Sequence, residues 1–136
     1  MLRYHVERMA VGYGSFAEYP TLEYSLLALT VIESPLFQKL WPLYWSEEDR
    51  GEFAAHISAT PEDGDVIRES GGLRKVRWKR PGTGKSSGVR IIYFIRSQEG
   101  EIMLVTMFAK GDMENIPVAK LKEIRRALEI QTPQRS

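Results

Sequence analysis

Basic side chains gather in one stretch of this sequence. Between Ser70 and Gln98 there is no Asp or Glu, while acidic side chains cluster earlier, within 47–52 and 62–65. A positive surface neutralises the phosphates that dominate affinity for nucleic acid. It also stabilises the extra negative charge of a five-coordinate phosphorus when a 2′-hydroxyl attacks the neighbouring phosphate. The basic residues here are Arg74, Lys75, Arg77, Lys79, Arg80, Lys85, Arg90 and Arg96.

The spacing of these residues predicts a β-hairpin. The glycine-rich segment 81–88 is typical of a long turn, and the apolar run 89–96 predicts the returning strand. Trp78 is predicted to be a core residue, because it alternates with Lys75 and Arg77. We interpret the hairpin as an RNA-binding surface, and a solvated charged face is the alternative. One face carries Leu73, Lys75, Arg77 and Lys79, and the other carries Arg74, Val76, Trp78 and Arg80.

Other chemistries find less support in the sequence. The segment 82–86 (GTGKS) ends like a phosphate-binding P-loop, but Lys79 stands where a P-loop has glycine, and a strand follows instead of a helix. Metal-dependent nuclease sites need clustered carboxylates or histidines, whereas His5 and His56 are the two histidines. We interpret His56 as structural. The sequence therefore predicts no metal site and no cofactor.

The elements that must position the hairpin follow from the apolar pattern. Residues 26–33 (LLALTVIE) predict a strand. Ser34 before Pro35 is typical of a helix start, and Pro42 ends or kinks that helix. Ser46 and Asp49 indicate a capping box at the start of a second helix. After the hairpin, residues 102–109 predict a third strand of an antiparallel meander, and Pro117 opens a last helix.

The order of these elements is β-α-α-β-β-β-α, an α+β domain in which helices pack on an antiparallel sheet. We expect residues 1–25 to form an irregular extension, residues 26–130 the domain, and residues 131–136 a tail. The 136 residues suit one compact domain, and no apolar run reaches the roughly 18 residues needed to span a membrane. The absence of cysteine suits a cytosolic protein.

Three segments together carry a family resemblance: 71–78 (GGLRKVRW), 81–88 (PGTGKSSG) and 89–94 (VRIIYF). They resemble the HigB-like branch of the RelE/ParE toxin superfamily, whose members are toxins of bacterial type II toxin–antitoxin modules. The continuation 104–110 (LVTMFAK) fits the same pattern, and the resemblance covers about residues 26–128.

This resemblance implies a compact sheet with helices on one side. It implies a cytoplasmic endoribonuclease that cleaves mRNA in the ribosomal A site, by 2′-hydroxyl attack and without metal. The partners implied are mRNA, ribosomal RNA and a co-encoded helix-turn-helix antitoxin. Lys75, Arg77, Arg90 and Lys110 occupy the positions of the family's basic catalytic residues. Arg74, Lys79, Arg80 and Lys85 are expected to contact the RNA backbone.

The sequence also departs from the family pattern. Some relatives use a tyrosine in or near the last helix, whereas no tyrosine follows Tyr93 here. The general base is therefore unassigned, and a lysine serves if cationic neighbours lower its pKa. Two alternatives stay open: a gyrase-inhibiting toxin of the ParE type, and an inactive RNA-binding relative.

Overall fold

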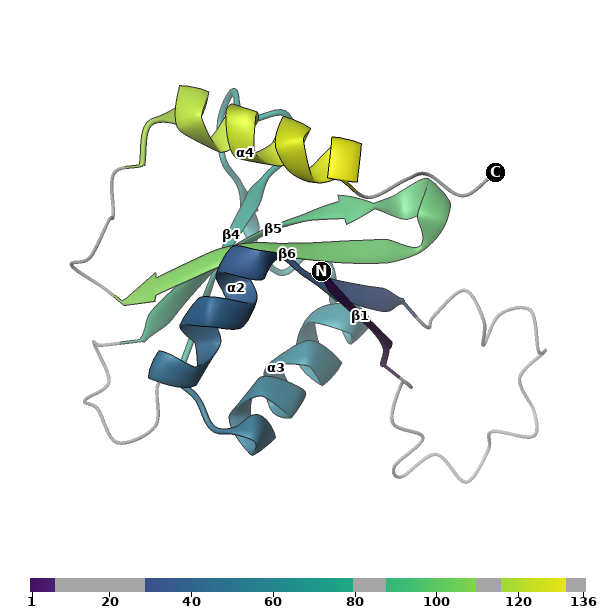
Figure 1. The fold of residues 1–136 in the computed structure, drawn as a ribbon, viewed down its shortest axis with the longest axis vertical. Coiled ribbons are helices and arrows are strands. Elements are labelled where there is room, and N and C mark those ends of the chain that lie inside the picture. The colour runs from purple at the N-terminus through teal and green to yellow at the C-terminus, as the bar shows by residue number, and fades with distance from the viewer. Residues whose placement is uncertain (7–28, 80–87, 110–115, 132–136) are drawn as a thin grey trace.

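A six-stranded sheet forms the centre of the computed structural model, which describes residues 1–6, 29–79, 88–109 and 116–131 (Figure 1). The strands follow one another across the sheet in the order β1-β2-β6-β5-β4-β3. Their bounds are β1 (Leu2–His5), β2 (Thr30–Glu33), β3 (Asp65–Val66), β4 (Arg74–Trp78), β5 (Val89–Arg96) and β6 (Glu101–Ala109). The helices are α2 (Pro35–Leu40), α3 (Glu47–Ala59) and α4 (Val118–Gln131), with short 3₁₀ turns at Trp41–Leu43 and Ser97–Glu99.

The predicted α+β class and the predicted order of elements are confirmed, with β1 and β3 as additional short strands. Strands β4, β5 and β6 form the expected antiparallel meander. The sheet as a whole is mixed, because β2 runs parallel to β6. The chain leaves β2 through two helices before it enters the meander, and a crossover of this length allows two neighbouring strands to run in the same direction.

Both N-terminal helices begin as the sequence predicts. The Ser34 hydroxyl accepts a hydrogen bond from the Phe37 amide at 3.0 Å, with Pro35 in the first turn of α2. Pro42 lies in the 3₁₀ turn that ends this helix. At the start of α3, Ser46 and Asp49 form a reciprocal capping box, with bonds of 3.0 and 3.1 Å. Each cap contributes about 1 kcal/mol.

Helices cover both faces of the sheet rather than one (Figure 1). On one face, α2 and α3 pack over a core that includes Phe53, Ile91 and Tyr93. On the other, α4 packs through Leu121 and Leu128 over a second core. Every residue of β6 is buried. Its side chains point alternately to the two faces of the sheet, so both faces are apolar at this strand and both are covered by helices.

The first residues of the chain differ from the irregular extension predicted for residues 1–25. Leu2–His5 forms an edge strand, β1, that pairs antiparallel with β2. Four residues are too few to show a periodic pattern, so the sequence carried little signal for this strand. Residues 7–28 lie outside the described part of the chain, and with them the first residues of the strand predicted at 26–33.

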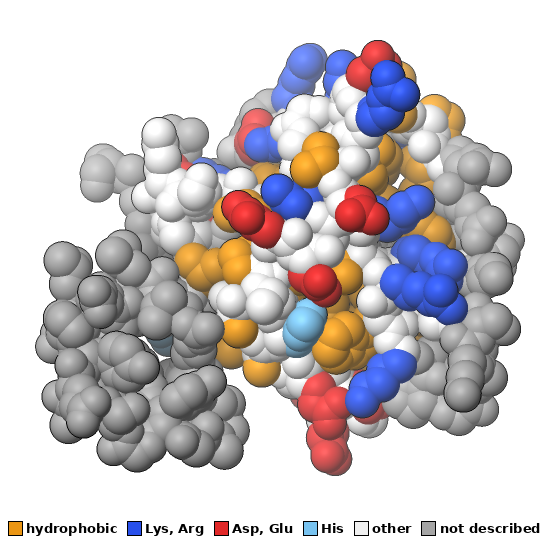
Figure 2. All heavy atoms as spheres, turned by 180° about the vertical axis from the view of Figure 1, so that it is seen from behind, with side chains coloured by type: hydrophobic (Ala, Val, Ile, Leu, Met, Phe, Trp, Pro, Cys, Tyr) orange, Lys and Arg blue, Asp and Glu red, His pale blue; other side chains and the backbone are white. Residues whose placement is uncertain are grey.

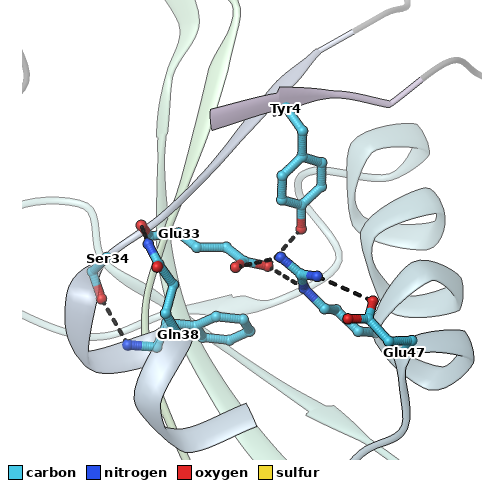
Figure 3. A network of polar contacts seen from close by, with 7 residues as sticks. Tyr4, Glu33, Ser34, Gln38 and Glu47 are labelled. Atoms are coloured by element: carbon cyan, nitrogen blue, oxygen red, sulfur yellow. Dashed lines mark hydrogen bonds and ion pairs between the residues drawn. The ribbon is translucent and has the colours of Figure 1, made fainter. Parts of the chain in front are cut away.

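Buried charges fix β1 and α3 to the edge of the sheet (Figure 3). Glu33 is fully buried and accepts hydrogen bonds from Nη2 and Nε of Arg50 at 2.7 and 2.8 Å. The Tyr4 hydroxyl donates to the same carboxylate at 2.7 Å. Burial, followed by the charge of Glu33, raises the pKa of Tyr4, so this phenol remains a donor. The bond to Glu33 raises the pKa of Arg50, whose guanidinium also lies 4.6 Å from the ring centre of Trp41.

A second buried carboxylate, Glu101, is held in the same way. Nη1 of Arg96, a largely buried residue on β5, donates to it at 3.1 Å. Arg3 of β1 forms a further ion pair with this carboxylate. Both Glu33 and Glu101 thus have a partner on β1 as well as one elsewhere in the fold. The strand therefore belongs to the folded unit.

Candidate nucleic-acid interface

Three of the predicted basic residues lie on one face of strands β4 and β5. Lys75 and Arg77 are exposed, while the intervening Val76 is buried, as the alternation predicts. The register sets Arg77 directly opposite Arg90 of β5. Side chains directly opposite one another share a face, with Cβ atoms about 4.5–5.5 Å apart. Two arginines and one lysine are therefore presented together.

The face continues onto β6 and forms two rows across three strands. In the first row, Arg90 lies between Arg77 and Phe108. In the second, Ile92 lies between Lys75 and Thr106. Along each strand the rows are two residues apart, or roughly 6.6–6.8 Å at about 3.3–3.4 Å per residue. The space-filling view shows Lys and Arg side chains gathered toward its right side (Figure 2).

Gly88 lies beside the arginine pair, where the connecting loop of the hairpin enters β5. Nη1 of Arg90 donates to the Gly88 carbonyl at 3.1 Å. A Cβ atom at Gly88 would lie 2.6 Å from the carbonyl oxygen of Trp78, and 3.5 Å from Cγ and Nε of Arg77. Any side chain at this position would push the ends of β4 and β5 apart, next to the pair.

A hollow of about 290 Å³ opens on the same face, between the sheet and the start of α4. Among the described residues, its walls are apolar except for Lys75, and they include Ile92 and Phe108 of the sheet together with Val118 and Leu121 of α4. Phe108 and the α4 residues were missed by the sequence reasoning. Their position depends on the register of β6 and on the packing of α4, which no local pattern indicates.

The remaining predicted contacts are distributed differently. Arg74 faces the other side of the sheet, where its Nη1 donates to the carbonyls of Glu62 and Gly64 at 3.2 and 2.7 Å. It holds the loop before β3. Lys79 is exposed and lies 3.6 Å from Glu52. Arg80, Lys85 and Lys110 are outside the described residues, as is the 82–86 segment that resembles a P-loop.

Two aromatic residues of the hairpin pack in the hydrophobic core. Trp78 packs on the α3 side, with its ring centre 5.4 Å from that of Phe53, which confirms its predicted place. Tyr93 is also buried, and its hydroxyl accepts from the Gly64 amide and donates to the Pro61 carbonyl, both at 2.8 Å. Burial raises the pKa of Tyr93. Neither ring is presented to the Lys75 face.

His56 lies against the indole of Trp78, with the two ring centres 4.8 Å apart. Its Nε2 atom is 2.9 Å from a carboxylate oxygen of Asp63. Across the described residues, no group of three or more His, Cys, Asp or Glu side chains is placed to hold a metal ion. None of the helices described is both long and apolar enough to cross a membrane.

No family model matches the sequence. Among solved structures, the chain is similar to a double arginine-to-alanine mutant of E. coli toxin RelE in the free state, with a TM-score of 0.48 and 15% sequence identity. The similarity covers 70% of this chain and 94% of that chain.

Proposed function

We propose that this protein is a ribosome-dependent mRNA endoribonuclease, the toxin of a type II toxin–antitoxin pair. The observation that carries the proposal is the cross-strand pair Arg77–Arg90 with Lys75 on the same exposed face. The resemblance of segments 71–78, 81–88 and 89–94 to HigB-like toxins supports it. The mRNA in the A site and the ribosomal RNA would be its partners in the cytoplasm, and a helix-turn-helix antitoxin would neutralise it.

The chemistry follows from the positive charge of this face. The 2′-oxygen of the RNA attacks the adjacent phosphorus and loses its proton, the bond to the 5′-oxygen breaks, and that oxygen takes up a proton. The products are a 2′,3′-cyclic phosphate and a 5′-hydroxyl. Arg77 and Arg90 would hold the phosphate and stabilise the charge of the five-coordinate state, with Lys75 beside them. Positioning of the RNA and stabilisation of the developing charge would supply the rate enhancement, without a metal.

Lys110 is also proposed near this site, from the family pattern alone. Lys79, Arg80 and Lys85 are proposed to contact the RNA backbone. Arg74 is the weakest of the proposed RNA contacts, because its guanidinium already bonds two loop carbonyls on the other side of the sheet.

The test compares wild type with Arg90→Ala and with Arg126→Ala, which removes an exposed arginine on α4. Each is expressed briefly, and the 5′ ends of translated messages are mapped. Wild type and Arg126→Ala should produce new ends within codons, and Arg90→Ala should lose most of them. Growth arrest without new mRNA ends would overturn the proposal; altered DNA supercoiling would then indicate gyrase inhibition. Expression without arrest or cleavage would indicate an inactive relative.

A further inference from the structure

The loop before β3 is bonded to the sheet from the face opposite Lys75. Arg74 of β4 and Tyr93 of β5 stand directly opposite one another, and Tyr93 belongs to the core under α3. The Tyr93 hydroxyl accepts from the Gly64 amide and donates to the Pro61 carbonyl, both at 2.8 Å. Arg74 donates to the Gly64 carbonyl at 2.7 Å. Two side chains from neighbouring strands therefore hold one short loop.

This loop leads directly into the strand that lies along the outer side of β4. Strand β3 has two residues, and Asp65 is the one that pairs with Lys75. Strands usually have roughly 3–10 residues, so β3 is weak by itself. A Cβ atom at Gly64 would lie 2.8 Å from Cε1 of Tyr93 and 3.0 Å from the carbonyl oxygen of Lys75. The loop, the phenol ring and the β4 backbone are thus in close contact at the level of Lys75.

A single oxygen atom of Tyr93 makes both loop bonds. Burial raises the pKa of this phenol, so the hydroxyl remains protonated at neutral pH and can donate to the Pro61 carbonyl. Phenylalanine at this position would keep the ring and remove the oxygen. The buried amide of Gly64 would then lose its partner, which favours opening of the loop.

We propose that Tyr93 is a positioning residue for Lys75, acting through loop 61–64 and β3. Tyr93 is fully buried on the α3 face and does not itself contact RNA. Its loop bonds keep β3 on β4, so β4 has a bonded neighbour on each side at Lys75. Because such a strand opens less often than an edge strand, the Lys75 ammonium stays near the phosphate held by Arg77 and Arg90. This inference rests on the proposed function, which assigns Lys75 to that phosphate.

The test is a double-mutant cycle of Tyr93→Phe and Lys75→Ala, with cleavage of a translated message and thermal unfolding measured for all four proteins. Lys75→Ala should lower the cleavage rate by at least about tenfold. Tyr93→Phe should lower it by roughly tenfold, less than the hundredfold expected for a displacement of about 1 Å. In the Lys75→Ala background, Tyr93→Phe should cost less than about twofold more, because the group that it positions is absent. The melting temperature should fall on Tyr93→Phe in both backgrounds.

The cycle separates a positioning role from a purely structural one. If Tyr93→Phe lowers cleavage equally in both backgrounds, the inference is overturned and Tyr93 serves stability alone. Wild-type cleavage by Lys75→Ala would instead refute the proposed role of Lys75, and the inference with it. A wild-type protein that cleaves no message would refute the proposed function itself.

A matched control and a measurement that needs no activity complete the test. Tyr4→Phe also removes a hydroxyl from a buried bond, at 2.7 Å from Glu33, and should leave cleavage unchanged. In Tyr93→Phe, the amides of Asp65 and Lys75 should exchange their hydrogens about fivefold faster, the factor expected for the loss of roughly one hydrogen bond. Tyr4→Phe should not change these rates. Wild-type exchange of both amides in Tyr93→Phe would overturn the inference.

Arg74→Ala replaces Tyr93→Phe if that variant does not fold, because it removes loop bonds made by a side chain that is not fully buried. Its effect on cleavage should likewise disappear in the Lys75→Ala background. A loss that persists there would overturn the inference and identify Arg74 as an RNA contact.

Discussion

Two groups of charged side chains in this protein differ in what surrounds them. Around Glu33, the guanidinium of Arg50 and the hydroxyl of Tyr4 bond one fully buried carboxylate, inside the edge of the sheet (Figure 3). On the hairpin face, Arg90 is anchored through a backbone carbonyl, and Lys75 is exposed to solvent. In the first group, the charges are paired inside the fold. In the second group, positive charge lies at the surface.

The comparison separates two roles that the sequence alone does not distinguish. Arg50 and Arg90 are both arginines on regular elements, and neither type nor local pattern assigns a role to them. An arginine that satisfies a buried acid contributes to stability, whereas one fixed by a backbone contact near the surface keeps a charge for a ligand. Substitutions in the two groups should therefore affect different measurements.

The largest effect on stability is expected from Arg50→Ala. Removing this side chain leaves Glu33 buried without its charged partner, which should cost about 3–5 kcal/mol in the free energy of unfolding. Urea denaturation measures it. Glu47→Gln removes an exposed partner of the same arginine and should cost less than about 0.5 kcal/mol. Equal losses for the two variants would contradict the role given to the buried network.

Gly88→Ala should reduce cleavage by roughly 10- to 100-fold, because small displacements of positioned groups have effects of that size. The added Cβ forces apart the strand ends that carry Arg77 and Arg90. Gly51→Ala is the matched control, since a Cβ there meets nothing within 4 Å. Both proteins are assayed in a translating extract alongside urea denaturation. A folded Gly88→Ala protein with wild-type cleavage would show that the glycine does not position the arginines.

The salt dependence of RNA binding should depend on the basic residues of the hairpin face and not on the buried network around Glu33. Phosphate contacts by Lys75, Arg77 and Arg90 should contribute roughly −2 to the slope of log affinity against log salt, at about −0.7 per contact for single strands. Lys75→Ala should reduce the slope by about 0.7. Lys39→Ala, at an exposed position of α2, should leave it unchanged. Fluorescence anisotropy at several salt concentrations measures these slopes, and a Lys75→Ala slope equal to wild type would exclude its phosphate contact.

The smallest effect is a pH dependence of stability at alkaline pH. The pKa of Tyr4 is raised in the folded protein, so the folded state holds this proton more tightly than the unfolded state. Its contribution is fully present below the unfolded pKa of about 10 and is lost as the pH rises above that value. Unfolding measured between about pH 9 and pH 11, one unit either side of that pKa, should show this loss. Tyr4→Phe should lose stability less steeply, and an identical slope would contradict this role of Tyr4.

Local features of the fold could be predicted from the sequence, and long-range pairings could not. The caps at Ser34 and Ser46 and the alternation that buries Val76 depend on neighbours within a few residues, so their signal is local. Strand β1 depends on carboxylates far along the chain, at Glu33 and Glu101.

The candidate site shows the same division. That Lys75 and Arg77 share a face follows from strand geometry. That Arg90 stands opposite Arg77, and Phe108 opposite Arg90, depends on the registers of two hairpins, which composition does not set. Arg74 shows that a positive charge in the sequence does not by itself identify an RNA contact, because its guanidinium is bonded to the loop before β3.

The most direct test of the central claim is the cleavage rate of Arg90→Ala relative to wild type on a translated message, measured together with its unfolding free energy. The proposed role of Arg90 predicts a loss of about 100- to 1,000-fold in rate, the usual cost of removing one group that stabilises transition-state charge. The unfolding free energy should stay near that of wild type, since Arg90 bonds a backbone carbonyl and no buried acid in the described structure. Undiminished cleavage by a folded Arg90→Ala protein would contradict it.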